Sequence, residues 1–315
     1  MSKSILAKND SILIVGGTGF IGLHIVKEAL DRNLQVTIIS KNHNALPLRI
    51  KGVEYLEVDI SNIEKLSNKL KGRGFHHVIN LGGYVDHSDY SSGGDRVFDV
   101  HFNGTKNIIG SINKDILRSF IQIGSSDEYG MNAAPQNESQ RESPISPYSL
   151  AKTVTTHFLQ MLYRTEQFPV VILRPFLVYG PGQGMNRFIP QVINGCIKGD
   201  EFPTSEGMQL RDFCFISDFV QSVFSCIGNA KVHGEVINVA SGDPISIKDV
   251  VIKIQKIVTT GSPQFGQTSY RNGENMKLYA DITKAKSLLN WEPRVSLDEG
   301  LKKTINFIRD ICNGK

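Results

Sequence analysis

The sequence predicts an α/β protein built on a doubly wound parallel sheet, and two patterns support this. Short apolar runs rich in β-branched residues alternate with amphipathic segments of helical periodicity, which is typical of β-α-β units. The runs are almost continuously apolar, which indicates strands that are buried on both faces of a sheet. Strands are therefore expected at SILIV (11–15), QVTIIS (35–40), VEYLEV (53–58), HHVINL (76–81), FIQIG (120–124) and VVILR (170–174).

The first expected strand ends in a glycine loop, ILIVGGTGFIG, with Gly16, Gly19 and Gly22 three residues apart. After the loop, the apolar residues of segment 21–30 fall on one helical face. Glycines at this spacing permit a tight turn, close approach of the backbone to a pyrophosphate, and close packing of helix on strand. Because the helix N-terminus then presents amides to phosphate, the loop predicts a dinucleotide-binding (Rossmann) domain. A strand–turn–helix joint without a ligand is the alternative interpretation.

The end of the second strand should select the cofactor. An acidic residue there would bind the ribose 2′-hydroxyl of NAD, whereas the 2′-phosphate of NADP needs positive charge and hydrogen-bond donors. This sequence has Ser40, Lys41 and Asn42 at that point. Lys41 would attract a phosphate that an aspartate would repel. The sequence therefore favours NADP (NADPH), the alternative being that Lys41 is an ordinary surface lysine.

Composition excludes several classes of function. The 35 basic and 31 acidic residues give a net charge of +4 and are scattered, so no nucleic-acid partner is expected. The four cysteines form no C-x-x-C pair, so neither a metal site nor a disulfide framework is indicated. No apolar run reaches the ~18–20 residues of a membrane helix, and the N-terminus lacks signal-peptide character. We therefore expect a cytoplasmic protein that does not enter a membrane.

The pattern changes from Pro175 onward, where Gly and Pro interrupt RPFLVYGPGQG and the expected helices become shorter. We expect an NADP-binding domain at residues 1–175, to which about 213–242 return through the strand-like run EVINVAS. The remaining segments, 176–212 and 243–315, should form a smaller, discontinuous C-terminal lobe that binds the substrate.

A second set of motifs lies in the middle and in the C-terminal half of the chain. SPYSLAK contains Tyr148-x-x-x-Lys152, IGSSDEYG lies upstream of it, and LRPFLVYGPG, QLRDFCFISD and WEP follow in order. Together with GGTGFIG, this ordered set resembles the extended short-chain dehydrogenases/reductases. More narrowly, it resembles the NAD(P)-dependent epimerase/dehydratase family that acts on nucleotide sugars, and the resemblance covers nearly the whole chain.

The resemblance implies catalytic roles for three residues. Tyr148 would be the acid/base, Lys152 would bind the nicotinamide ribose and lower the tyrosine pKa, and Ser125 would orient the reacting oxygen. On a helix, Tyr148 and Lys152 share a face, and a phenol of ordinary pKa ~10 needs a nearby cation to approach neutrality. A different stripe of that helix should form its core face, which would leave the pair facing a cleft. This stripe consists of Leu150, Val154, Phe158, Met161 and Leu162.

The resemblance also implies the ligand contacts. Arg211 and Arg271 match two family arginines that grip the substrate diphosphate, and the planar guanidinium suits such oxyanions. The expected contacts of the nucleotide-diphosphate sugar are Ser126, Asp127, Asn186, Arg187, Arg211 and Arg271. The expected cofactor contacts are Gly16, Thr18, Gly19, Phe20, Ile21, Gly22, Ser40, Lys41, Asn42, Asp59, Ile60, Leu81, Gly82, Gly83, Tyr148, Lys152 and Pro175.

Some positions depart from the family pattern. The 4,6-dehydratases carry Thr-Asp-Glu where this chain has Ser125, Ser126 and Asp127, so dehydration is disfavoured, although a one-residue loop shift would restore an Asp-Glu pair. His101 replaces a common asparagine, which would alter a proton path or a helix kink. Leu177 replaces an asparagine that contacts substrate phosphate in many relatives.

The leading hypothesis is an NADPH-dependent reductase of the C4 keto group of a dTDP- or CDP-linked 4-keto-6-deoxyhexose, in 6-deoxysugar or polysaccharide biosynthesis. The alternatives are a nucleotide-sugar 4-epimerase or 4,6-dehydratase with tightly bound NAD, and a non-catalytic NADP-binding module. A homodimer is also expected. It would pair through the helix that carries Tyr148 and the preceding helix near residues 95–112, with contributions from Thr155, Thr156 and Leu159.

Overall fold

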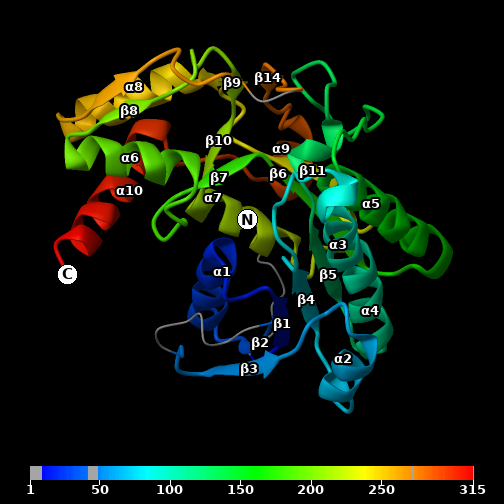
Figure 1. Cartoon of the computed structure of the whole chain (residues 1–315). Coiled ribbons are helices and arrows are strands. Elements are labelled where there is room, and N and C mark those ends of the chain that lie inside the picture. The colour runs from blue at the N-terminus through cyan, green and yellow to red at the C-terminus, as the bar shows by residue number, and fades with distance from the viewer. Residues whose placement is uncertain (1–8, 42–48, 271–272, 315) are drawn as a thin grey trace.

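The computed structural model describes residues 9–41, 49–270 and 273–314. Its centre is a seven-stranded sheet in the order β11-β6-β5-β4-β1-β2-β3 (Figure 1). All neighbouring pairs are parallel, which confirms the predicted doubly wound parallel sheet. Its strands are β1 (Ser11–Val15), β2 (Gln35–Ser40), β3 (Val53–Glu57), β4 (His77–Asn80), β5 (Ser119–Ile123), β6 (Val170–Pro175) and β11 (Val236–Val239).

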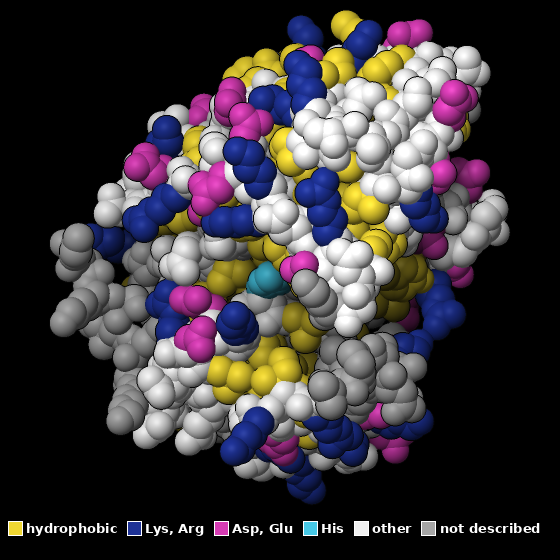
Figure 2. All heavy atoms as spheres, turned by 90° about the vertical axis from the view of Figure 1, so that its left-hand side faces the viewer, with side chains coloured by type: hydrophobic (Ala, Val, Ile, Leu, Met, Phe, Trp, Pro, Cys, Tyr) yellow, Lys and Arg dark blue, Asp and Glu magenta, His cyan; other side chains and the backbone are white. Residues whose placement is uncertain are grey.

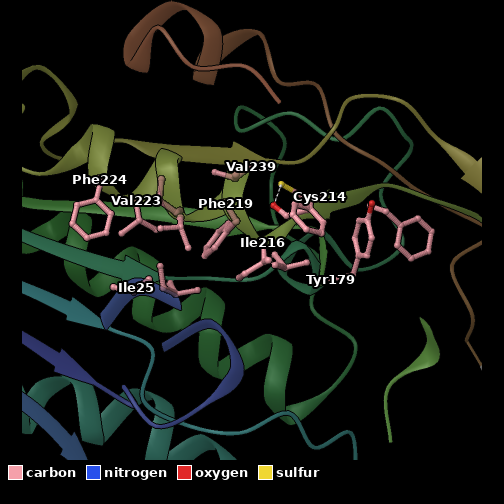
Figure 3. Close-up of a cluster of buried hydrophobic side chains, with 14 of the residues drawn as sticks. Ile25, Tyr179, Cys214, Ile216, Phe219, Val223, Phe224 and Val239 are labelled. Carbon is pink, nitrogen blue, oxygen red and sulfur yellow. Dashed lines mark hydrogen bonds between the residues drawn. The ribbon is translucent and has the colours of Figure 1, made fainter. Parts of the chain in front are cut away.

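Helices cover both faces of this sheet. Successive strand residues point to opposite faces, so Ile12 and Ile14 of β1 enter one core while Leu13 and Val15 enter the other. The first core includes α1 (Phe20–Asp31) and α7 (Ile216–Cys226). Figure 3 shows Ile25 of α1 together with residues of α7 in this cluster. The second core includes α2 (Ile63–Leu70), α4 (Gly104–Ser111) and α5 (Pro147–Glu166).

Helix α5 begins at a capping box. The Ser146 hydroxyl accepts a hydrogen bond from the Ser149 amide at 3.1 Å, and the Ser149 hydroxyl accepts one from the Ser146 amide at 2.9 Å. Pro147 occupies the first helical position, where its missing N–H costs no helical bond. The sequence SPYS therefore fixes the start of the helix one residue before Tyr148.

The predicted core face of α5 is wrong. Leu150 and Met161 are 45% and 41% exposed, whereas Ala151 and Leu159 are buried. The reason is that Tyr148 itself is buried against the sheet, and residues three or four positions apart along a helix share a face. Of the predicted stripe, Leu150 and Met161 are turned to the surface, Val154 and Phe158 are half-buried, with Phe158 packed against the second core, and only Leu162 is buried.

The orientation of α5 also shows that the residues expected at a dimer contact are wrong. Thr155, Thr156 and Leu159 are each at most 1% exposed within a single chain, so their side chains have no surface to offer a second copy. The apolar surface that α5 does expose lies at Leu150 and Met161. Homodimer formation itself stays a prediction.

The later part of the chain forms the helices and short sheets drawn at the top of Figure 1. Its helices are α6 (Phe188–Lys198), α8 (Ile247–Val258), α9 (Thr283–Leu289) and α10 (Leu297–Cys312). Its small sheets pair β7 (Leu177–Tyr179) with β10 (Phe213–Phe215), β8 (Glu201–Pro203) with β13 (Ser262–Gln264), and β9 (Leu210–Arg211) with both β12 (Ile245–Ser246) and β14 (Lys277–Leu278). The strand from EVINVAS is β11, which pairs with β6. The proposed domain boundaries stay a prediction.

Short helical segments complete the fold. They are η2 (Tyr90–Ser92), α3 (Gly94–Phe98), the π-helical turn η3 (Asp99–Asn103), η4 (Ser126–Tyr129) and η5 (Ala230–Val232). Among the residues described, no helix is both long and apolar enough to cross a membrane. Within the same ranges, no group of three or more His, Cys, Asp or Glu side chains could hold a metal ion.

Candidate active site

A cavity of about 1480 Å³ lies at the carboxyl ends of the sheet strands. Its lining includes Val15, Ser40, Ile123 and Pro175, the last residues of β1, β2, β5 and β6. Ligands of open parallel sheets bind at this edge. On the face drawn in Figure 2, hydrophobic side chains are visible in a hollow between charged side chains. Asn42 and Arg271 lie outside the described residues. Of the other predicted site residues, all but Gly82 line the cavity.

The glycine loop forms one wall of the cavity. A Cβ atom on Gly22 would lie 2.5 Å from the Gly16 carbonyl oxygen, so only glycine permits this close contact between helix and loop. Gly19 caps α1 without a side-chain hydrogen bond, and the first amides of a helix have no acceptor within the helix. Thr18, Phe20 and Ile21 line the cavity beside them. These amides therefore fit the pyrophosphate of a dinucleotide.

The predicted cofactor-selecting residue Lys41 is paired with a carboxylate. Its ammonium lies 2.7 Å from an oxygen of Asp59, the residue expected to contact the adenine. Burial raises the pKa of Asp59, but Lys41 and hydrogen bonds from Ser61 outweigh this and lower it overall. Next to the pair, the hydroxyls of Thr18 and Ser40 are 3.1 Å apart. The charge expected to attract a 2′-phosphate is thus partly compensated by a neighbouring acid.

The remaining predicted cofactor contacts, with one exception, line the same cavity. Ile60, Leu81, Gly83 and Pro175 line the cavity. Gly82 lies behind this wall, because its amide donates to Asn80 Oδ1 at 2.9 Å and a Cβ atom would come within 2.8 Å of Ile60 Cδ1. Gly82 thus supports the wall of the cavity without lining it.

Ser125, Tyr148 and Lys152 meet at the inner end of the cavity. The Ser125 hydroxyl is a hydrogen-bond partner of the Tyr148 phenol, and the Lys152 ammonium donates to the Ile123 carbonyl oxygen at 2.7 Å. The Lys152 nitrogen lies 5.8 Å from the centroid of the Tyr148 ring. The sequence separation of four residues on α5 therefore produces the predicted pairing.

The resemblance implied a lowered pKa for Tyr148, but in this structure burial dominates and the pKa of Tyr148 is raised. Burial, reinforced by the Asp127 carboxylate, raises the pKa of Tyr148 above its ordinary value, while Ser125 opposes the rise. Burial also lowers the pKa of Lys152 to about 8, although the neighbouring acids Glu128 and Asp127 oppose that shift. Near neutral pH the tyrosine is a neutral proton donor and the lysine is still largely cationic.

His101 lies behind Tyr148, in the π-helical turn. Its ring stands edge-on to the Tyr148 ring at a centroid distance of 5.2 Å, and its Nε2 lies 2.8 Å from the Tyr84 carbonyl oxygen. Burial, with Lys152 adding to it, lowers the pKa of His101 to about 3, so the ring is neutral and Nε2 carries its proton. A Cβ atom on Gly83 would lie 2.1 Å from this ring, so the histidine needs glycine there. The wide π turn accommodates this arrangement.

The side chains of the SSDE segment (125–128) point in different directions. Ser126 and Asp127 line the cavity, and Asp127 Oδ2 lies 3.9 Å from Nε2 of His87, a residue not singled out in the sequence. Burial raises the pKa of Asp127, while His87 opposes the rise. Glu128 instead points into the protein and is fully buried. Its carboxylate accepts hydrogen bonds from Arg174 at 2.7 Å and from the Ser125 amide at 2.9 Å.

The predicted diphosphate site is basic but contains an acid. Arg211 forms an ion pair with Glu274, and its Nη1 donates to the Leu210 carbonyl oxygen at 2.8 Å. Asn186 and Arg187 lie exposed at the start of α6 and line the same cavity. A diphosphate that binds Arg211 must therefore compete with, or displace, the Glu274 carboxylate. Leu177, in place of a family asparagine, is half-buried in β7 and also lines the cavity.

Comparison with known proteins gives consistent similarities. The model of the NAD dependent epimerase/dehydratase family matches residues 12–240. The UDP-N-acetyl-alpha-D-glucosaminuronate decarboxylase of Bacillus cytotoxicus is 29% identical, over 96% of this chain and 98% of its own. A dTDP-glucose 4,6-dehydratase of Xanthomonas campestris is 26% identical, over 94% of this chain and 92% of its own. The crystal structure of the UDP-glucuronic acid 4-epimerase of Bacillus cereus, in complex with UDP-glucuronic acid and NAD, is 27% identical with a TM-score of 0.84, and the match covers 96% of this chain and 99% of that one.

Proposed function

This chain belongs to the NAD dependent epimerase/dehydratase family, and we propose that it oxidises and re-reduces C4 of a nucleotide-linked hexose within one active site. The reactions named for its relatives are decarboxylation, 4,6-dehydration and 4-epimerisation. A transient ketone at C4 serves each of them. Reduction of this ketone from the opposite face gives the 4-epimer. The ketone also acidifies the hydrogen on C5, which permits 4,6-dehydration, and it stands β to a carboxylate at C6, which permits decarboxylation.

The group formed by Ser125, Tyr148 and Lys152 carries this proposal. Tyr148 exchanges a proton with the C4 oxygen, and Ser125 donates a hydrogen bond to that oxygen as charge develops on it. The Lys152 ammonium lowers the energy of the phenolate form of Tyr148. Bound NAD supplies the hydride acceptor at C4 and the hydride donor for the return step. Arg187 and Arg211 hold the diphosphate, because both line the cavity on its lobe side.

We propose NAD as the resident cofactor. Lys41 is paired with Asp59 at 2.7 Å, so a 2′-phosphate would approach a compensated charge and a nearby carboxylate. The similar Bacillus cereus enzyme was crystallised with NAD. A site that oxidises and reduces the same sugar has no need for an exchangeable reductant, which agrees with a retained NAD.

The experiment is cofactor extraction followed by a substrate panel. Purified protein is denatured and its released nucleotide is identified by chromatography; retained NAD is the expected result. The protein is then incubated with UDP-glucose, UDP-glucuronic acid and dTDP-glucose, and the products are identified by NMR. Conversion of one sugar without net NADH formation supports the proposal. Protein that carries no NAD and converts none of these sugars would overturn it.

A second function is favoured by one observation: the residues at the end of β2 are Ser40 and Lys41, and neither carries a carboxylate. Under it, the enzyme is an NADPH-dependent reductase of a dTDP- or CDP-linked 4-keto-6-deoxyhexose, using the same tyrosine as proton donor. Stoichiometric loss of NADPH absorbance with such a ketone, and formation of its 4-hydroxy product, would identify this activity in place of internal oxidation and reduction.

A further inference from the structure

We infer that His87 and Asp127 form a second proton-transfer unit in this cavity, which moves a proton at a carbon next to the C4 ketone. The inference rests on the proposed function, because only a ketone at C4 makes those hydrogens acidic. Tyr148 serves the C4 oxygen, so a separate group is needed to remove a proton from carbon. His87 and Asp127 are placed to supply it.

The two side chains come from different elements and meet beside Tyr148. His87 lies in the loop after β4, and its Nε2 is 3.9 Å from Asp127 Oδ2 in η4. The His87 ring stands edge-on to the Tyr148 ring, with centroids 5.6 Å apart. All three residues line the cavity. A proton acceptor at this position therefore lies close enough to Tyr148 for both groups to contact the same sugar ring.

The loop that carries His87 is held on both sides. The Tyr84 carbonyl oxygen accepts the hydrogen bond from His101 at 2.8 Å. The Asp86 carboxylate accepts hydrogen bonds from the amide and the hydroxyl of Ser88, at 2.8 and 2.6 Å. Positioned acids and bases need such support from neighbouring groups. The contacts fix His87 without covering it, since 44% of its side chain stays exposed.

The two histidines beside Tyr148 differ in what they can do. His101 is buried and its Nε2 proton is committed to the Tyr84 carbonyl oxygen. His87 lines the cavity with 44% of its side chain exposed, and its Nε2 lies 3.9 Å from the Asp127 carboxylate. Other charged groups near Asp127 are Glu128, Arg211 and Lys152. His101 lines the cavity too, but burial lowers its pKa to about 3, which disfavours protonation of its second ring nitrogen. His87 is therefore the better placed of the two histidines to accept a proton from a ligand in the cavity.

The step conserves atoms and charge. The His87 imidazole takes the proton from C3 or C5, and the electron pair of that C–H bond forms a carbon–carbon double bond to C4. The C4 carbonyl becomes an enolate, whose negative oxygen accepts hydrogen bonds from Ser125 and Tyr148. The Asp127 carboxylate stabilises the imidazolium. Return of a proton from His87 to carbon restores the ketone, and in D2O the returned particle is a deuteron.

The test is deuterium exchange into 4-keto-6-deoxyglucose linked to dTDP, CDP, UDP or GDP, followed by ¹H NMR in D2O. The probe is already a ketone, so exchange requires no hydride transfer. Wild-type protein should exchange the C3 or C5 hydrogen faster than buffer. A positioned base typically contributes ~10²–10⁴-fold, so His87→Gln and Asp127→Asn should each slow exchange at least about 100-fold. Calorimetric affinity for the same ketone should be retained in His87→Gln.

His157→Gln is the matched control, because this histidine also lies close to a carboxylate, 3.1 Å from Glu142, but does not line the cavity. It should exchange at the wild-type rate. Oxidation at C4 of a 4-hydroxy sugar, followed as the transient absorbance of enzyme-bound NADH in a single turnover, should survive in His87→Gln. Three results would overturn the inference. They are wild-type exchange no faster than in buffer, unchanged exchange in His87→Gln, and loss of exchange, binding and C4 oxidation together in His87→Gln. Exchange without any C4 oxidation would instead refute only the proposed function, and a failure of all four ketones to bind would refute both.

Discussion

Glu128 forms a fully buried ion pair, and its replacement by glutamine tests how much that pair stabilises the protein. One carboxylate oxygen accepts from Arg174 at 2.7 and 3.0 Å and from Thr156 at 2.8 Å, and the other accepts from the Ser125 amide at 2.9 Å. A glutamine has one acceptor oxygen and one NH2 group. Whichever way it turns, its NH2 group faces either the arginine or the serine amide, both of which are donors.

Breaking one side of a buried ion pair costs about 3–5 kcal/mol, because the other charge remains buried. Here Arg174 keeps a second carboxylate, Glu142 at 2.6 Å, so we expect Glu128→Gln to lower the free energy of unfolding by about 3 kcal/mol, the lower end of that range. Glu54→Gln is the control. Its pair with Arg73 is also 2.7 Å long but is 47% and 35% exposed, and exposed pairs contribute about 0–1 kcal/mol.

Urea unfolding, followed by tryptophan fluorescence, measures both variants. Trp291 is the single tryptophan and is buried, with its indole N–H donating to the Asp218 carbonyl oxygen at 2.9 Å. The two variants should differ by about 2 kcal/mol or more in the free energy extrapolated to water. If Glu128→Gln and Glu54→Gln are destabilised equally, the reasoning from burial is refuted.

Four further predictions concern catalysis, pH, cofactor and assembly. Tyr148→Phe should lower turnover by about 10²–10⁴-fold while leaving the NAD content of the purified protein unchanged; active Tyr148→Phe would contradict its role. Because a lysine loses its charge above its pKa and that of Lys152 is lowered by burial to about 8, kcat/KM should fall as pH rises above 8, and a flat profile to pH 10 would count against a required ammonium. Ser40→Asp should weaken binding of NADPH more than that of NADH, by repulsion of the 2′-phosphate, and equal effects in a fluorescence titration would exclude this loop from cofactor selection. Sedimentation at micromolar concentration should show a homodimer that Met161→Glu dissociates, since α5 exposes Leu150 and Met161; a wild-type monomer would rule the dimer out.

Local patterns were sufficient to predict the sheet. Runs such as SILIV and VVILR are too apolar to lie at a surface, and both became interior strands of the sheet. The glycine loop was equally readable, because close packing of Gly22 on Gly16 leaves no room for a side chain. Tyr148 and Lys152 were singled out by the family resemblance, and their spacing agrees with it, since four residues along a helix bring two side chains to one face.

Features that depend on distant parts of the chain were not predictable in this way. The apolar residues of α5 suggested the wrong core face because Tyr148 and Lys152 are themselves buried there. Glu128 reads as part of a polar turn, and only its contact with Arg174, 46 residues away, shows that it is a buried structural acid. His87 carries no motif at all; its position beside Asp127 follows from how the loop after β4 folds over α5.

The place of β11 in the sheet has a consequence for synthesis on the ribosome. Five residues of β6 are buried, and β11 supplies its outer neighbour from more than sixty residues later in the chain. A nascent chain that has emerged only as far as β6 therefore presents a row of unpaired backbone groups flanked by apolar side chains. Such an edge is a template for pairing with another chain. The seven-stranded sheet can be completed only after residues 176–235 have been made, which couples the folding of this intervening segment to that of the sheet.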